Sequence, residues 1–262
     1  MTRHIPRKRF GQNFLVDTQV IAAILEAFDP DRDDCLVEIG PGLGALTWPL
    51  LRSVNHLHVV EIDRDIVERL RSEFPEEKLI VHACDALEFD FSTLGKNLRV
   101  LGNLPYNIST PFLFHLSQFA PTIRDMHFML QKEVVARMVA APSTRDYGRL
   151  SVMLQNCFEM EQLFIVPPEC FHPAPKVESA FVRMIPRSKP LVESNIQQLF
   201  TRIVLAAFAQ RRKTLRNTLR DYLHPDDFAE LEIDPGQRAE NLSVLQFVSI
   251  AEYLKDKMQP PQ

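Results

Sequence analysis

The sequence predicts an α/β protein: a doubly wound, Rossmann-like sheet followed by a small all-helical C-terminal domain. Short apolar segments alternate with segments of helical periodicity over the first two-thirds of the chain, which favours parallel strands joined by helical crossovers. Beyond the proline-bracketed segment 186–190 the pattern is helical, with no strand signal. We therefore expect two domains, at residues 1–186 and 187–262.

The predicted elements of the first domain follow an N-terminal arm rich in basic residues. A helix is expected from Thr18 to Phe28, capped by Asp17 or Thr18. After it we expect, in order, a strand at 35–39, a helix at 45–51, a strand at 58–62, a helix at 64–74, strands at 79–81 and 98–101, a helix at 111–119, a strand at 126–130 and a helix at 133–139. The segments 157–166 and 179–185 resemble a hairpin-type pair that closes one edge of the sheet. In the second domain, helices are expected at 196–208, 212–223, 228–231 and 244–258.

The composition is that of an ordinary globular protein, with 262 residues, 45% of them hydrophobic and 24% charged. No apolar run approaches the roughly 20 residues that a membrane-spanning helix needs, and the N-terminal arm lacks the apolar core of a secretory signal. The four cysteines, Cys35, Cys84, Cys157 and Cys170, are far apart and are not spaced as metal ligands. We therefore expect a monomer in a reducing cytoplasm, with no metal and no membrane partner.

Basic residues are concentrated in two segments, although the formal net charge is -4. Residues 1–16 contain no acid, and neither do residues 194–220. Arg212, Arg216 and Arg220 fall four apart, which on a helix makes one stripe of like charge. A solvated basic face is the simpler interpretation, and a phosphate-binding face is the alternative that the missing acids favour. The predicted nucleic-acid contacts are Arg7, Lys8, Arg9, Arg211, Arg212, Lys213, Arg216 and Arg220.

A cofactor site is predicted where the first three strands end. A glycine-rich turn that includes Gly40 and Gly42 follows the first strand, Glu61 ends the second and Asp85 follows the third. Each acid alone is more often a helix cap or a solvated charge, but the carboxyl ends of parallel strands meet at one edge, where ligands bind. A phosphate loop of the ATPase type is absent, and NAD remains open. The carboxylate-rich, non-basic turn favours S-adenosylmethionine, whose sulfonium is a cation.

The fourth strand ends in Asn103-Leu104-Pro105-Tyr106, which is the most informative stretch of the chain. In isolation it is most simply a strand-end turn with a buried tyrosine. At a ligand-binding edge, the side-chain carbonyl of Asn103 and the backbone carbonyl of Leu104 are placed to accept both hydrogens of a nucleobase amine. The ring of Tyr106 would then lie against the base. Methylation of a base amine uses all of these groups, whereas hydride transfer has no evident use for them.

Six motifs together resemble the ribosomal RNA adenine N6,N6-dimethyltransferase family, and in particular its bacterial small-subunit (kasugamycin-resistance) branch. They cover nearly the whole chain and are found at residues 12–15, 38–44, 103–111, 147–151, 171–177 and 210–215. Two positions depart from the pattern expected for the family. Cys84 stands where a glycine or asparagine is common, and Phe181 stands where a smaller apolar residue is usual.

The resemblance implies a methyltransferase sheet and the transfer of methyl groups from S-adenosylmethionine to N6 of two adjacent adenosines in a hairpin loop near the 3′ end of small-subunit RNA. Its partner would be that RNA in an immature 30S particle. The implied cofactor contacts are Asn13, Leu15, Gly40, Gly42, Glu61, Asp85 and Asn103. Phe171 is implied to sandwich the flipped base together with Tyr106.

Two other functions remain open from the sequence. The first is a non-catalytic RNA-binding factor in ribosome assembly, although a binding protein has no reason to keep the glycine turn and the Asn103–Tyr106 segment. The second is a large-subunit adenine methyltransferase of the kind that confers macrolide resistance. A NAD-dependent oxidoreductase would leave the basic segments unexplained.

Overall fold

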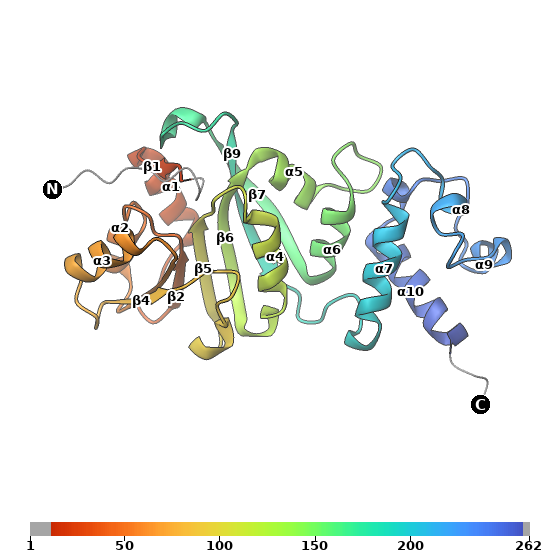
Figure 1. The fold of residues 1–262 in the computed structure, drawn as a ribbon, viewed down its shortest axis with the longest axis horizontal. Coiled ribbons are helices and arrows are strands. Elements are labelled where there is room, and N and C mark those ends of the chain that lie inside the picture. Colours follow the sequence, from red (N-terminus) through yellow and green to blue (C-terminus); the bar gives the residue numbers. More distant parts are fainter. Residues whose placement is uncertain (1–11, 259–262) are drawn as a thin grey trace. The chain divides into compact units, whose positions relative to one another are not determined.

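The structure is a computed structural model that describes residues 12–258, so the predicted contacts Arg7, Lys8 and Arg9 lie outside the described residues. It divides into two compact units (Figure 1). The first comprises residues 12–135 and 159–186, and the second comprises 136–158 and 187–258. The sequence analysis places 136–158 in the first domain. In the structure these residues group with the helical unit, because Tyr147 and Val152 belong to its core.

A seven-stranded sheet forms the centre of the first unit, in the order β4-β3-β2-β5-β6-β9-β7 (Figure 1). Its strands are β2 (Cys35–Ile39), β3 (Leu57–Glu61), β4 (Leu79–Ala83), β5 (Leu98–Asn103), β6 (Ile123–Gln131), β7 (Phe158–Val166) and β9 (Ser179–Pro186). The strands β2 to β6 pair in parallel, and β9 is antiparallel to β6. The predicted strands are confirmed, and β7 and β9 are neighbours at the sheet edge as expected.

The strand order changes direction between β2 and β5, because β3 and β4 lie on one side of β2 and β5 lies on the other. Such a switch point leaves a crevice at the carboxyl ends of the strands. Ile39 pairs with Gly102 there. A Cβ on Gly102 would lie 2.8 Å from the carbonyl oxygen of Ile39, so only glycine allows the two strands to approach so closely.

The helices of this unit are α1 (Thr18–Phe28), α2 (Thr47–Ser53), α3 (Arg64–Glu73), α4 (Ser109–Ser117) and the start of α5 (Lys132–Val139). Each overlaps a predicted helix, and α1 has the predicted bounds. The carboxylate of Asp17 accepts hydrogen bonds from the backbone N–H groups of Gln19 and Val20, both at 2.9 Å, which confirms it as the cap of α1.

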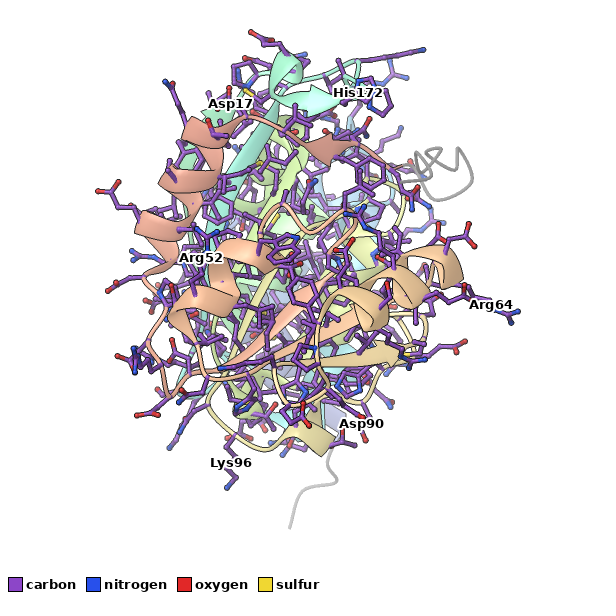
Figure 2. The ribbon with its side chains drawn as sticks, turned by 90° about the vertical axis from the view of Figure 1, so that its left-hand side faces the viewer. Asp17, Arg52, Arg64, Asp90, Lys96 and His172 are labelled. Carbon is purple, nitrogen blue, oxygen red and sulfur yellow. The ribbon has the colours of Figure 1, made fainter. Side chains whose placement is uncertain are left out.

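A two-stranded sheet that the sequence analysis did not predict ties the start of the described chain to a distant segment. The strand β1 (Phe14–Leu15) is antiparallel to β8 (Phe171–His172). The N–H of Val16 extends the pair by donating to the carbonyl of Cys170 at 2.9 Å. Asp17 and His172 therefore lie at the same end of the unit (Figure 2). This pairing fixes where residues 13–15 enter the fold.

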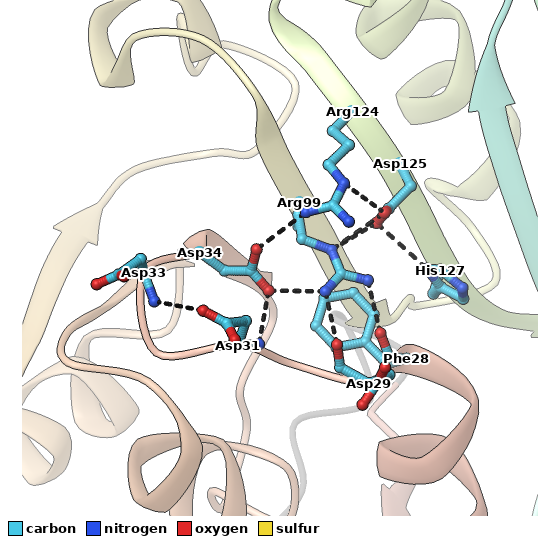
Figure 3. Close-up of polar contacts among 9 residues, drawn as sticks. All are labelled: Phe28, Asp29, Asp31, Asp33, Asp34, Arg99, Arg124, Asp125 and His127. Atoms are coloured by element: carbon cyan, nitrogen blue, oxygen red, sulfur yellow. Dashed lines mark hydrogen bonds and ion pairs between the residues drawn. The ribbon is translucent and has the colours of Figure 1, made fainter.

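The buried guanidinium of Arg99 links the N-terminal ends of β5 and β6 to the C-terminal end of α1 (Figure 3). Arg99 contacts the carboxylates of Asp34 at 2.7 Å and Asp125 at 3.0 Å. It also donates to the backbone carbonyls of Phe28 and Asp29. Burial alone would raise the pKa of Asp125, but the neighbouring imidazole of His127, 3.6 Å away, and the hydrogen-bonded guanidinium of Arg99 outweigh burial and lower it. The positive charge of Arg99 is thus paired with two carboxylates, and the network connects the strands to α1 at the end of the sheet opposite the switch point.

The second unit is helical. Its elements include α6 (Arg149–Cys157), α7 (Gln197–Ala207), α8 (Leu215–Thr218), α9 (Pro225–Glu230) and α10 (Val244–Met258). Phe200, Leu215 and Phe247 are completely buried in a core that draws on these segments. The sequence analysis missed α6 but predicted α10 with its observed bounds.

One predicted helix of this unit is wrong. Residues 212–223 form only the short helix α8 between turns. The N–H of Leu215 donates to the carbonyl of Gln237 at 2.8 Å, and that of Arg216 donates to Pro235 at 3.1 Å. In a continuous helix these N–H groups would instead donate to carbonyls four residues earlier in the chain. The segment also contains Thr214, Asn217 and Thr218, which are weak helix formers. No helix among the described residues is long and apolar enough to cross a membrane.

Candidate functional site

A cavity opens at the carboxyl ends of β2, β3 and β5, beside the switch point of the sheet. Its lining includes every position that the sequence analysis assigned to the cofactor: Asn13, Leu15, Gly40, Gly42, Glu61, Asp85 and Asn103. Leu104, Pro105 and Tyr106 line the same cavity. The structure therefore brings the glycine turn, the two acids and the Asn103–Tyr106 segment together at one site.

The glycine turn holds its shape through backbone conformations that other residues rarely adopt. Gly40 and Gly42 have φ angles of +63° and +54°. The N–H of Gly40 donates to the carbonyl of Val60 at 3.0 Å, which joins the turn to β3. A Cβ on Gly42 would lie 3.0 Å from the ring of Phe14. The turn therefore packs closely against β1 and leaves no room for a side chain there.

Two buried carboxyl groups flank the turn. Burial raises the pKa of Glu38 to about 8, and the nearby charge of Glu61 acts in the same direction, although a hydrogen bond from the Thr47 hydroxyl at 2.7 Å opposes both. Burial also raises the pKa of Glu61, against the lowering effect of backbone N–H donors such as that of Asp63 at 2.8 Å. A cationic ligand in the cavity would favour the ionised form of both groups.

Glu38 is a site residue to which the sequence analysis gave no role. Glu38 stands two residues before Gly40, at the start of the glycine motif. The glycines of that motif indicate a ligand-binding turn, but they do not indicate a role for the acid that precedes them. Its side chain is 2% exposed and lines the cavity. Cys84, one of the two departures from the family pattern, also lines the cavity, next to Asp85. Phe181, the other departure, is completely buried and is part of the core of the sheet unit.

The amide of Asn103 has a defined orientation. Its Nδ2 donates to the backbone carbonyl of Asn13 at 2.9 Å. Because a carbonyl oxygen only accepts hydrogen bonds, the nitrogen must face Asn13. The amide is planar, so the side-chain oxygen Oδ1 points away from Asn13. Asn103 thus presents a carbonyl oxygen, and not an N–H group, on its other side.

The residues after Asn103 form the rest of this wall. The N–H of Leu104 donates to the carbonyl of Met129 at 3.2 Å, which holds the turn against β6. Tyr106 is half-buried, and its hydroxyl oxygen lies 2.7 Å from that of Ser179. Burial raises the pKa of Tyr106, so the phenol stays neutral at physiological pH. The wall therefore combines oriented acceptors with an aromatic ring.

The structure does not bring Phe171 to the cavity. Its side chain is 4% exposed and lies in the apolar core with Leu15 and Val166. Phe171 is not among the residues that line the cavity. Its pairing with Leu15 in the β1–β8 sheet accounts for this burial. The stacking role expected for Phe171 therefore finds no support here, and its observed contacts help to hold β1 in place.

The predicted nucleic-acid contacts of the helical unit are exposed, although not as one helical stripe. Arg211, Arg212, Lys213, Arg216 and Arg220 are all exposed, but only Arg216 lies on α8. The guanidinium of Arg211 donates to the backbone carbonyl of Arg145 at 3.0 Å and lies 3.6 Å from Glu240. These residues form a basic segment spread over turns on both sides of α8.

Comparison with protein families matches residues 3–256 to the family described as ribosomal RNA adenine dimethylase. The chain belongs to this family. The ribosomal RNA small subunit methyltransferase A of Nitrosospira multiformis is 70% identical over 251 residues, which cover 96% of this chain and 97% of that protein. The protein of the same name from Thiobacillus denitrificans is 63% identical over 251 residues, which cover 96% and 98%. The family resemblance inferred from the sequence is thus confirmed.

Solved structures confirm the fold class. A dimethyladenosine transferase from Plasmodium falciparum superposes with a TM-score of 0.80 at 23% identity, over 93% of this chain and 98% of that chain. The 23S rRNA methyltransferase ErmE superposes with a TM-score of 0.72 at 26% identity, over 93% of this chain and 100% of that chain. Family membership and this likeness both fit a Rossmann-like sheet.

The raised pKa of Glu38 predicts a pH-dependent stability for the ligand-free protein. The folded protein keeps this carboxyl protonated up to about pH 8, whereas in the unfolded chain it ionises near 4.5. Between these values the folded state binds more protons than the unfolded state. The contribution of Glu38 to the free energy of unfolding is therefore complete below pH 4.5, and it is lost as the pH rises from 4.5 through 8. Glu38→Gln keeps an acceptor for Thr47 but does not titrate. Urea unfolding at pH 5.5 and 8 should show a loss of stability that is about 1–3 kcal/mol larger in the wild type than in the variant. An equal loss in both proteins would contradict the assignment.

Proposed function

We propose that the protein transfers methyl groups from S-adenosylmethionine to N6 of two adjacent adenosines, in a hairpin loop near the 3′ end of small-subunit (16S) ribosomal RNA. The observation that carries the proposal is the single cavity that joins the glycine turn, two buried acids and the Asn103–Tyr106 segment. The names of the relatives and of the family support the RNA class. Identity to a small-subunit enzyme is 70%, against 26% to the large-subunit enzyme ErmE, which favours small-subunit RNA over the large-subunit alternative.

The residues of the cavity fit S-adenosylmethionine. Glu61, at the end of β3, and Asp85 both line the cavity. In the proposed complex Glu61 accepts hydrogen bonds from the ribose hydroxyls, and Asp85 accepts one from the adenine amine. Gly40, where a Cβ would meet nothing within 4 Å, lets the backbone approach the methionine part without a side chain, and Gly42 lines the same wall. Leu15 and Asn13 complete the wall from the N-terminal side. When bound, the cofactor supplies an electrophilic methyl group on a positively charged sulfur, a charge that the buried carboxylates favour.

Asn103 and Leu104 activate the target amine. The lone pair of an adenine amine is delocalised into the ring, which makes the nitrogen a poor nucleophile. The Oδ1 of Asn103 and the backbone carbonyl of Leu104 accept the two amine hydrogens and stabilise the positive charge that develops on N6. As the new N–C bond forms, the methyl–sulfur bond breaks with its electron pair, and the alkylated amine releases a proton to water. Tyr106 stacks on the extruded base, a contact worth about 1–3 kcal/mol.

The basic segment at 211–220 supplies affinity for the RNA backbone. Its cations are exposed and lie in a chain region without acids, whereas the protein as a whole carries a formal charge of -4. Phosphates neutralise such a cluster and release bound counterions. The proposed partner is small-subunit RNA within an immature 30S particle in the cytoplasm, bound by a monomer. Arg7, Lys8 and Arg9 are proposed to add contacts from the N-terminal arm.

Methyl transfer is tested by incubating the protein with methyl-labelled S-adenosylmethionine and undermethylated small subunits, and then mapping the labelled nucleotides. We expect label on two adjacent adenosines. Asn103→Ala removes the amine acceptor and should lower the rate by at least about 100-fold, with RNA binding largely retained. Asn107→Ala is the matched control, because Asn107 is exposed and is not among the lining residues. Wild-type turnover in Asn103→Ala would refute the mechanism.

RNA binding through the helical unit is tested by the double variant Arg212→Glu with Arg216→Glu. It should weaken binding to small subunits and lower the slope of log affinity against log salt by about 1 for each phosphate that the variant no longer neutralises. The control is Arg64→Glu with Lys96→Glu, which makes the same change in net charge at two exposed positions of the sheet unit (Figure 2). Equal decreases in affinity for the two double variants would show that only net charge matters and would overturn the assignment.

A further inference from the structure

Ser179 contacts Tyr106, a residue of the cavity wall, without lining the cavity itself. It is the first residue of β9, and its side chain is completely buried. Its hydroxyl oxygen lies 2.7 Å from the hydroxyl oxygen of Tyr106. Tyr106 lines the cavity, whereas Ser179 is not among the lining residues. The contact therefore joins a fixed, buried group to the far end of a ring on the wall.

The backbone of Tyr106 does not by itself set the orientation of the ring. It lies in the turn between β5 and α4, where the N–H of Ile108 closes the chain by donating to the carbonyl of Pro105 at 3.2 Å. The turn sets the position of the Tyr106 Cα, but two side-chain torsions still decide the plane of the ring. A hydrogen bond at the phenol oxygen fixes the direction of the long axis of the ring. Because conjugation keeps the C–O–H group of a phenol in the plane of its ring, the position of the hydrogen-bond partner also restrains that plane.

Ser179 is well suited to serve as the fixed partner. Its Cα pairs with that of Gln131 at the end of β6, so its backbone belongs to the central sheet. The preceding residue, Glu178, accepts a hydrogen bond at its carbonyl from the N–H of Lys132 at 3.0 Å. The side chains of Lys132 and Glu178 form an ion pair at 2.7 Å. The start of β9 is thus held to the end of β6 by strand pairing, and to the first residue of α5 by a backbone hydrogen bond and an ion pair.

We propose that Ser179 is a positioning residue for methyl transfer, which holds the ring of Tyr106 at the angle at which the target base stacks. The proposal rests on the proposed function, in which Tyr106 contacts the base. It explains why a tyrosine, and not a phenylalanine, follows Pro105: the hydroxyl is used for orientation. It also gives Ser179 a role in the productive placement of RNA, with no direct role in cofactor binding.

The neutral state of the phenol supports an orienting role over a proton-transfer role. Burial raises the pKa of Tyr106, while the hydrogen bond with Ser179 opposes that effect. A phenol that stays protonated at physiological pH does not accept the proton of the alkylated amine. Its hydroxyl is engaged with Ser179, on the side of β9. Tyr106 thus acts through its ring, and the hydroxyl serves to hold that ring.

A double-mutant cycle tests the proposal through kcat and KM for undermethylated small subunits. Ser179→Ala and Tyr106→Phe each remove one side of the same hydrogen bond. Each should lower kcat/KM for the RNA by about 3- to 10-fold, with affinity for S-adenosylmethionine unchanged. Because Ser179 acts only through the Tyr106 hydroxyl, the double variant should be no slower than either single variant.

Ser151→Ala controls for the general cost of removing a buried serine hydroxyl. Ser151 is also completely buried, its hydroxyl donates to the carbonyl of Arg137 at 2.5 Å, and it belongs to the helical unit. This variant should lose thermal stability without the change in kcat/KM. Multiplied decreases in the double variant Ser179→Ala with Tyr106→Phe would mean a purely structural role and would overturn the proposal, as would an unchanged rate in Ser179→Ala. A wild-type protein that transfers no methyl group would overturn the proposed function, and this role with it.

Discussion

The hydrogen bond from Asn103 to the backbone carbonyl of Asn13 is the interaction on which the site depends. It fixes which atom of the amide faces Asn13, and therefore leaves the carbonyl oxygen to act on a ligand. Two other features make it possible. The β1–β8 pairing holds residues 13–15 against the fold. The absence of a side chain at Gly102 lets β5 approach β2 closely, just before Asn103. A short segment at the start of the described chain thus completes a site built mainly by the sheet.

Charge is divided between the two units in a way that matches two different ligands. The cavity holds buried carboxyl groups, Glu38 and Glu61, whose ionisation is costly until a cation arrives. A sulfonium is such a cation, and its charge disappears when the methyl group leaves. The helical unit instead presents exposed arginines at 211–220, where a polyanion is the fitting partner. Neither ligand class is apparent from the formal net charge of -4.

Much of the sheet and the cofactor wall could be predicted from the sequence, because buried parallel strands are continuous apolar runs and their carboxyl ends share one edge. The misses have local causes. The strands β1 and β8 are two residues each, too short for periodicity to reveal. The expected helix at 212–223 gives way to hydrogen bonds from Leu215 and Arg216 to a turn far along the chain. The burial of Phe171 follows from pairing with Leu15, which no local pattern indicates.

The orientation of the Asn103 amide is the central claim, and a crystal structure of the protein with S-adenosylmethionine and an adenosine-containing RNA hairpin tests it most directly. The expected result has the cofactor in the cavity between Gly40 and Asp85, with Asn103 Nδ2 still on the Asn13 carbonyl and Oδ1 within hydrogen-bond distance of the adenosine N6. A cofactor bound elsewhere, or an amide turned so that its nitrogen faces the adenosine, would contradict the account.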